Sequence, residues 1–126
     1  MNAILRFEIL DAIEENNVDR VLELINQGAE LNNPIDTTPL IWAARCGNVE
    51  MIKLLVEQGA DVNLQLDDDG DFDTALMLAK DLETTKTLVE LGADVNIKNM
   101  YQETAYSMAK FVGYQDICDY LEPLMK

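Results

Sequence analysis

The chain has 126 residues, a length that fits one domain, and 48% of them are hydrophobic, which is enough for a continuous core. Its formal net charge is −15, from 24 acidic and 9 basic residues. Because such a field repels phosphate backbones and anionic lipid surfaces, the composition argues against nucleic acid and membranes and favours a basic protein as partner. An acidity that only keeps the chain in solution is the alternative, and it stays open.

A five-residue phrase recurs along the chain: glycine, alanine, an acid, an apolar residue and asparagine, at 28–32, 59–63 and 92–96. The glycines that open it are 31 and 33 positions apart (59 − 28 and 92 − 59). A period near 33 residues is typical of stacked helical repeats. Such arrays usually hold a partner on an extended surface, so the repeat indicates a binding function.

The first unit predicts two helices, over about 3–16 and 18–27. It lacks the Thr-Pro opening found in the next unit and carries polar residues for an outer face, so we expect it to act as an N-terminal cap. Its apolar positions at helical spacing predict a buried stripe of Ile9, Ala12, Ile13, Val18, Val21, Leu22 and Ile25.

The second unit is the most regular. Thr38 is suited to cap a helix and Pro39 to occupy its first position, where the missing N–H costs nothing. Gly47 breaks this helix, and an amphipathic pattern predicts a second one over 49–57. Gly59 then ends the unit as a left-handed C-terminal cap would.

This unit resembles an ankyrin repeat, whose usual opening is T-P-L-H-x-A. The residues that carry the resemblance are Thr38-Pro39-Leu40-Ile41-Trp42-Ala43-Ala44 and the closing Gly59-Ala60-Asp61-Val62-Asn63, with Ile41 in the place of the histidine. The resemblance covers essentially the whole chain. It implies an all-α solenoid of helix–turn–helix units with projecting loops, in one domain over 1–126, with units of roughly 1–33, 34–66, 67–99 and 100–126.

The third unit is irregular. Eighteen positions separate Thr74 from its closing Gly92, against 21 between Thr38 and Gly59 in the second unit (92 − 74 and 59 − 38). The third unit therefore loses the glycine-containing turn between its helices. Its first helix, over 75–80, must be short or its turn abrupt.

The fourth unit opens at Thr104, turns at Gly113 and stops near Pro123, as a C-terminal cap would. Cys118 lies in its apolar second helix and is predicted to be buried. Cys46 lies at a helix end and is predicted to be more exposed. Because the two cysteines are about two repeats apart, we expect no disulfide between them.

Enzymatic function and export find little support in the chain. Without histidine, the usual general base is absent and a cysteine nucleophile has no partner, so we expect no enzyme and no cofactor. The first residues carry charges where a signal peptide needs an apolar run, and no stretch is long enough to span a membrane. We therefore expect a cytoplasmic protein that is monomeric.

The connection between the second and third units is lengthened. Thr74 follows Asn63 by 11 positions, three more than the 8 that separate Thr104 from Asn96 in the regular connection. The lengthened loop holds five aspartates around one glycine and one phenylalanine. It has three interpretations: a solvated acidic loop, a loop that faces a partner, or a calcium loop, because hard carboxylate oxygens can converge on one cation. The alternating aspartates of the calcium interpretation are Asp67, Asp69, Asp71 and Asp73.

The resemblance also implies a concave binding face, formed by the loops, called fingers, and by the exposed side of each first helix. Tyr101 and Phe72 are the predicted apolar anchors, and Phe111 is either an anchor or folds over the end of the array. Trp42 is predicted to pack in the core. The predicted partner-binding residues are Ile35, Asp36, Thr37, Arg45, Cys46, Asp69, Asp71, Phe72, Asp73, Lys80, Met100, Tyr101, Glu103, Phe111 and Val112.

The sequence thus predicts a protein–protein interaction module. A small chain of this kind is expected to act by occupancy, as an inhibitor, a neutraliser or an adaptor that holds a partner, and the net charge favours a basic one. An immunity-type protein that masks a basic toxin is one form of this hypothesis, and calcium binding by the aspartate loop is the alternative from another class.

Overall fold

The computed structural model describes residues 3–33, 37–67 and 71–125. Helices follow one another in pairs, and the described residues form no strand. In chain order the elements are α1 (Ala3–Glu14), α2 (Val18–Asn26), α3 (Pro39–Cys46), α4 (Val49–Glu57), α5 (Ala75–Leu78), α6 (Leu82–Glu90), α7 (Ala105–Val112), α8 (Gln115–Leu121) and the 3-10 helix η1 (Glu122–Leu124).

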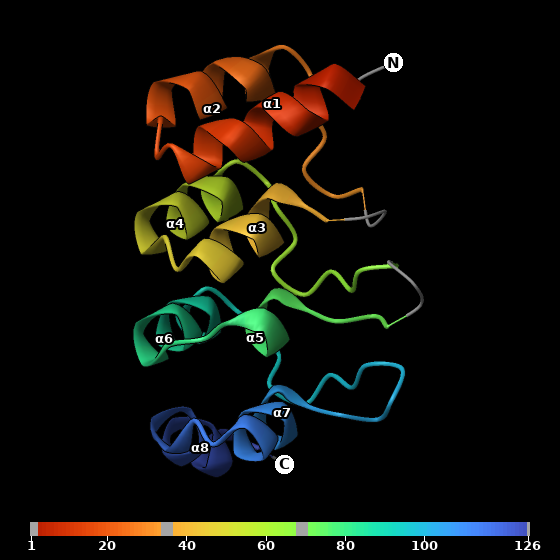
Figure 1. The fold of residues 1–126 in the computed structure, drawn as a ribbon, viewed down its shortest axis with the longest axis vertical. Helices are drawn as coiled ribbons and strands as arrows, with labels where there is room; N and C mark the ends of the chain where they lie inside the picture. The colour runs from red at the N-terminus through yellow and green to blue at the C-terminus, as the bar shows by residue number, and fades with distance from the viewer. Residues whose placement is uncertain (1–2, 34–36, 68–70, 126) are drawn as a thin grey trace.

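The pairs stack along one axis (Figure 1). Helices α1, α3, α5 and α7 pack against one another in series and form an inner layer, while α4, α6 and α8 pack in series in an outer layer that α2 begins. The connections between pairs project from one side of the stack, away from the outer layer (Figure 1). The molecule is therefore an all-helical solenoid with loops along one edge.

The inner helices begin where the sequence predicts. The hydroxyl groups of Thr38, Thr74 and Thr104 each accept a hydrogen bond from the backbone N–H three residues on, at 3.2, 3.3 and 3.2 Å. Pro39 occupies the first turn of α3, where no intrahelical partner for its nitrogen is needed. These caps satisfy backbone donors that the start of a helix leaves without a partner.

The turns inside the pairs explain why α5 is short. Gly47, between α3 and α4, and Gly113, between α7 and α8, adopt left-handed backbone with φ of 72° and 99°, and Asn16 does the same after α1. The third pair has no such residue. Its helix α5 makes a single turn of four residues, after which Ala79 is extended, with ψ of 136°. The predicted loss of the turn is thus confirmed.

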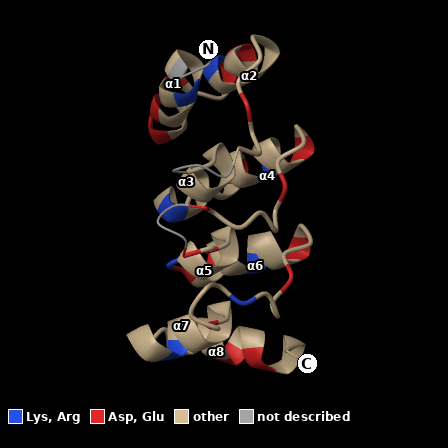
Figure 2. Cartoon of the chain, turned by 90° about the vertical axis from the view of Figure 1, so that its right-hand side faces the viewer, with Lys and Arg blue, Asp and Glu red and all other residues tan. Residues whose placement is uncertain are grey.

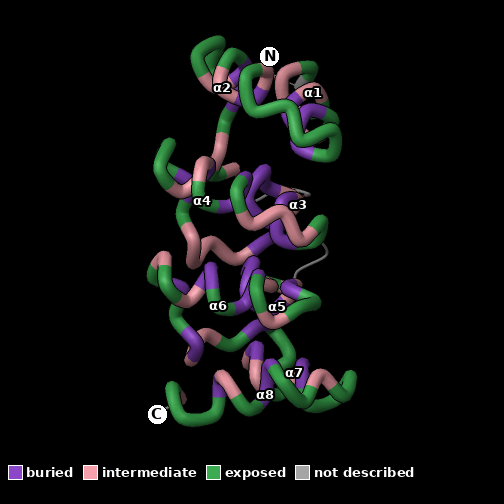
Figure 3. The backbone as a smooth tube through the Cα atoms, turned by 90° about the vertical axis from the view of Figure 1, so that its left-hand side faces the viewer, coloured by how far each residue is buried: buried purple, intermediate pink, exposed green. Residues whose placement is uncertain are grey.

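The core runs as one cluster between the two layers (Figure 3). It contains most of the predicted stripe of the first unit, but Val18, at the first position of α2, is exposed and Leu22 is only half-buried, whereas Leu24, which the predicted stripe left out, is fully buried. Trp42 is only partly buried, although it packs against the core. Cys118 is buried, Cys46 is exposed, and both are free thiols, as predicted.

The recurring phrase forms a clamp between neighbouring units. The side-chain amide of Asn63 donates to the Gly92 carbonyl at 3.1 Å, and its oxygen accepts from the Asp94 N–H at 2.7 Å. Asn32 binds the carbonyl of Gly59 and the N–H of Asp61 in the same way, at 3.0 and 2.7 Å. The asparagine of one phrase therefore binds the backbone of the next phrase, and the contact forms at both spacings, 31 and 33 residues.

Candidate functional site

Thr37 lies just before α3, and Arg45 and Cys46 lie in its last turn. The other predicted site residues fall into three groups. Ile35, Asp36 and Asp69 lie outside the described residues, and their assignment stays a prediction. The residues of the acidic finger (64–73) and of the last finger (97–103) lie side by side. Those at the far ends of the inner helices, Lys80, Phe111 and Val112, form a separate group, which no described hydrogen bond or ion pair joins to the fingers.

The described part of the acidic finger is held by hydrogen bonds to its own two arms and to the next finger. The N–H of Leu66 donates to the Asp73 carbonyl at 2.8 Å, which closes the base of the loop. The side chain of Gln65 donates to the carbonyls of Phe72 and Lys98, both at 2.9 Å. The two fingers therefore form one surface, a connection that none of the three interpretations of the loop included.

Asn99 is the residue that organises this surface. It is buried, and its oxygen accepts from the N–H groups of Tyr101 and Glu103, at 2.9 and 3.0 Å. Its amide donates to the carboxylates of Asp73 and Glu103, at 2.9 and 3.0 Å. Sequence reasoning missed Asn99, but an asparagine at the start of a turn is a known signal for a side chain that bonds the backbone two residues on.

Three large apolar side chains are exposed where the fingers meet. The exposed fractions are 40% for Phe72, 59% for Met100 and 64% for Tyr101. The N–H of Met100 donates to the Asp71 carbonyl at 2.8 Å, and the Tyr101 hydroxyl donates to the Asp71 carboxylate at 3.2 Å. We call Phe72, Met100 and Tyr101 the finger-tip cluster.

Electrostatics follow from these contacts. The hydrogen bond to Asp71, and then the charge of that carboxylate, raise the pKa of the Tyr101 hydroxyl, because ionisation breaks the bond and sets two anions face to face. Burial and the nearby charge of Glu14 raise the pKa of the Cys46 thiol. A thiol that is harder to deprotonate is a weaker nucleophile.

A shallow hollow of about 120 Å³ joins the acidic finger to the inner layer. Its walls are the side chains of Arg45, Leu66, Asp71, Asp73 and Leu78. Arg45, at the end of α3, has no ion-pair partner among the described residues. The hollow therefore offers a free guanidinium beside carboxylates that already accept hydrogen bonds from Tyr101 and Asn99.

The C-terminal end of α7 is exposed to solvent. Phe111 is 91% exposed and Val112 is 60% exposed, so the alternative in which Phe111 folds over the end of the array is wrong. Lys80 is also exposed, just beyond the end of α5.

Acidic and basic residues occur in both layers (Figure 2). In the inner layer Arg6 lies within α1, and three other basic residues lie at or just beyond helix ends: Arg45 in the last turn of α3, Lys110 in the last turn of α7, and Lys80 just after α5. Within the described ranges, no three histidine, cysteine, aspartate or glutamate side chains gather to hold a metal. Since Asp69 is not described, calcium binding stays a prediction.

The fold and its surface define a class, the stacked helix-pair repeat proteins that present loops and inner helices to a partner. The family model of ankyrin repeats, in three copies, matches residues 9–99, and the chain belongs to the ankyrin-repeat family. Repeats of this family are generally protein–protein interaction modules and are typically not enzymes. No curated protein matches the chain. Among the described helices, none is both long and apolar enough to cross a lipid bilayer.

Proposed function

We propose that this chain is an interaction module that acts by occupancy, as an inhibitor, neutraliser or adaptor, and that it binds its partner with the two fingers and the inner helices. The observation that carries the proposal is the finger-tip cluster. Phe72, Met100 and Tyr101 keep large apolar surfaces in solvent on loops that hydrogen bonds fix in place. Fixed aromatic side chains of this kind are common anchors of interfaces, because little side-chain entropy is lost on binding.

The backbone of Phe72 supports the same proposal. Its φ is 60°, a left-handed conformation that is unusual for a bulky residue. Strained backbone of this kind is found mostly at functional sites, where the surrounding structure holds it. Here it presents an aromatic ring at the tip of a finger, while the Phe72 carbonyl is held by Gln65.

Charge favours a partner whose facing surface carries basic groups near the fingers. Asp67, Asp71, Asp73 and Glu103 belong to the two fingers, and the net charge of −15 adds a long-range attraction for such a surface. Complementary charge speeds association more than it strengthens binding. An immunity-type protein that masks a basic toxin is one form of this proposal. We also propose that the chain is one domain of four repeat units, of which the first and last act as caps.

The proposal is tested by recovery of a partner from the native source. We expect the Phe72→Ala/Tyr101→Ala double variant to recover much less of a specific partner than the original chain, because both anchors are gone. The matched control is Glu50→Ala/Lys53→Ala, which changes two exposed residues of α4 in the outer layer. If the finger variant recovers the partner fully, the proposed anchors are wrong.

A further inference from the structure

Neutral side-chain amides, and not ion pairs, join the acidic finger to the last finger. Among the described residues, no salt bridge involves either finger. A primary amide has two N–H donors, and Gln65 uses both. One donates to the Phe72 carbonyl across its own loop, and the other donates to the Lys98 carbonyl on the last finger, both at 2.9 Å. The side chain of Gln65 therefore connects both arms of the acidic finger to the last finger.

Asn99 makes a second connection, between carboxylates. Its amide donates to Asp73 of the acidic finger at 2.9 Å and to Glu103 of the last finger at 3.0 Å. Two carboxylates that face each other repel, and an amide that binds both offsets this repulsion. Asn99 is only 4% exposed, so this connection lies below the surface of the fingers.

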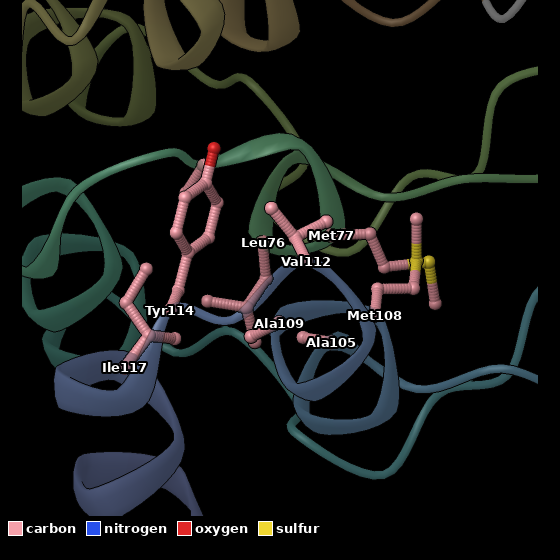
Figure 4. Close-up of a pocket in the computed structure, with 9 residues that line it drawn as sticks. Leu76, Met77, Ala105, Met108, Ala109, Val112, Tyr114 and Ile117 are labelled. Carbon is pink, nitrogen blue, oxygen red and sulfur yellow. The ribbon is translucent and has the colours of Figure 1, made fainter.

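The connection at Asn99 continues into the helical stack. The sulfur of Met108 in α7 lies 3.9 Å from the amide nitrogen of Asn99. Met108 and Met77 of α5 both line an apolar cavity of about 70 Å³ between the two inner helices (Figure 4). Asn99 thus contacts a side chain that packs where α5 meets α7, and this contact places the base of the fingers relative to the inner layer.

The proposed anchors depend on the alignment of the two fingers, because Phe72 lies on one and Met100 and Tyr101 lie on the other. Near the tips, the Met100 N–H and the Tyr101 hydroxyl both bind Asp71, at 2.8 and 3.2 Å. Met100 and Tyr101 are largely exposed, so water competes with these two bonds. The connections nearer the stack, at Gln65 and Asn99, are less exposed to this competition. Because both amides are neutral, they also leave the negative charge of the fingers available to a basic partner.

We infer that Gln65 and Asn99 are positioning residues, which hold Phe72 beside Met100 and Tyr101 so that a partner meets one preformed contact surface. The inference rests on the proposed function and adds how that surface is kept ready. Without these amides, only a fraction of the molecules holds the fingers in the binding arrangement, and the association rate falls by that fraction. The dissociation rate stays the same, because the contacts with the partner are intact. Truncation of an anchor has the opposite signature, since lost contacts raise the dissociation rate.

The first test needs no partner. Gln65→Met keeps the length of the side chain and removes its donors, and Asn99→Asp keeps the oxygen that accepts from the Tyr101 and Glu103 N–H groups but removes the amide. In both variants the Met100 amide, which bonds across the two fingers, should exchange with solvent about fivefold faster or more, as measured by NMR. Thermal unfolding verifies that the stack stays folded.

Two matched controls separate loss of the amides from other effects of these substitutions. Gln58→Met makes the same change at an exposed position at the end of α4. Gln102→Glu adds a carboxylate to the last finger and breaks no described side-chain hydrogen bond. Neither control should speed the exchange of the Met100 amide. An exchange rate that Gln65→Met and Asn99→Asp leave unchanged would overturn the inference.

The second test measures binding rates by surface plasmon resonance, with the purified partner that the original chain recovers from its native source. Gln65→Met and Asn99→Asp should each lower the association rate about fivefold or more and leave the dissociation rate unchanged, whereas Phe72→Ala should raise the dissociation rate. If Gln65→Met associates at the original rate while Phe72→Ala/Tyr101→Ala loses the partner, the positioning role is wrong and the proposed function stands. If the double variant keeps the partner, or the original chain recovers none, the proposed function fails and the positioning role falls with it.

Discussion

The side chain of Asn63 shows how neighbouring repeats are held together. Two of its hydrogen bonds reach the backbone of the next unit, and Asn32 makes the equivalent pair one unit earlier. A hydrogen bond of this kind contributes about 1 kcal/mol to stability, and a backbone group left without a partner costs more when it is buried than when water reaches it. Since repeats contact only their neighbours, each clamp stabilises one junction.

Replacing Asn63 by alanine should lower the free energy of unfolding by about 1–2 kcal/mol, because two hydrogen bonds to Gly92 and Asp94 are lost. Urea denaturation measures the change. Gln58→Ala, an exposed position at the end of α4, is the control and should change stability little. Equal effects of the two substitutions would show that the clamp contributes nothing.

The left-handed backbone of Phe72 lowers the stability of the chain, while its aromatic side chain is the proposed anchor for the partner. Phe72→Gly removes the cost of left-handed backbone, so the free energy of unfolding should rise by up to about 1 kcal/mol, while the anchor for the partner is lost. Phe72→Ala loses the anchor and keeps the strain. Thermal unfolding and recovery of the partner, measured on both variants, compare the two effects. A Phe72→Gly protein that is less stable than Phe72→Ala would contradict this account of the finger.

Tyr101 should ionise at a higher pH than an ordinary tyrosine, whose pKa is 10.0. Because its pKa is raised by folding, the stability that the hydroxyl contributes is complete below the pKa of the unfolded chain and is lost as the pH rises through the folded pKa. Phenolate absorbance, compared between the original chain and Tyr101→Phe, isolates this residue. Asp71→Asn should return the pKa toward its ordinary value, and an unchanged titration would exclude the described hydrogen bond.

At the scale of the element, the spacing of Thr74 and Gly92 was enough to predict that the third unit lacks its turn, and α5 ends after Leu78. The N-terminal caps of α3, α5 and α7 and the left-handed Gly59 at φ 110° were also predictable, because cap residues act locally. The spacing of Thr74 and Gly92 could not predict which residues become exposed because α5 is short. The exposure of Val112 depends on contacts between units that are distant in the sequence.

The finger surface, too, could be predicted from the sequence only in part. Its acidic residues and its aromatic anchors could be proposed from local composition and from family position. The hydrogen bonds of Gln65 to Lys98 and of Asn99 to Asp73 join segments 33 and 26 residues apart, so no local pattern reports them. The bond partners of Asp71, and with them the raised pKa of Tyr101, follow only once the two fingers are placed side by side.

Two glycines in equivalent turns offer a matched test of packing between elements. Gly47 and Gly113 both have positive φ, so alanine is strained at either. A Cβ atom at Gly47 would also lie 3.1 Å from a carboxylate oxygen of Asp81, which caps α6, whereas one at Gly113 meets nothing within 4 Å. Gly47→Ala should therefore destabilise the chain by about 1 kcal/mol more than Gly113→Ala. Chemical denaturation of both variants measures the difference, and a larger effect at Gly113 would be evidence against this packing.

At the scale of the molecule, the stack presents two kinds of surface: finger tips that carry acids and exposed aromatic side chains, and the ends of α3, α5 and α7, at or just beyond which Arg45, Lys80 and Lys110 lie. The outer layer supplies the support that keeps the inner helices in register. Because each unit contacts only its neighbours, the irregular third unit can change the inner surface locally while the rest of the stack stays regular. The account therefore centres on one claim, that a partner binds the side of the fingers and inner helices.

Hydrogen–deuterium exchange of the chain, free and bound to the partner recovered from its native source, tests that claim most directly. We expect binding to slow the exchange of amides at 64–67, 71–73 and 97–103 and near the end of α7, and to leave α2, α4 and α6 unchanged. Slowing that is confined to the outer helices, with the fingers exchanging as in the free chain, would contradict it.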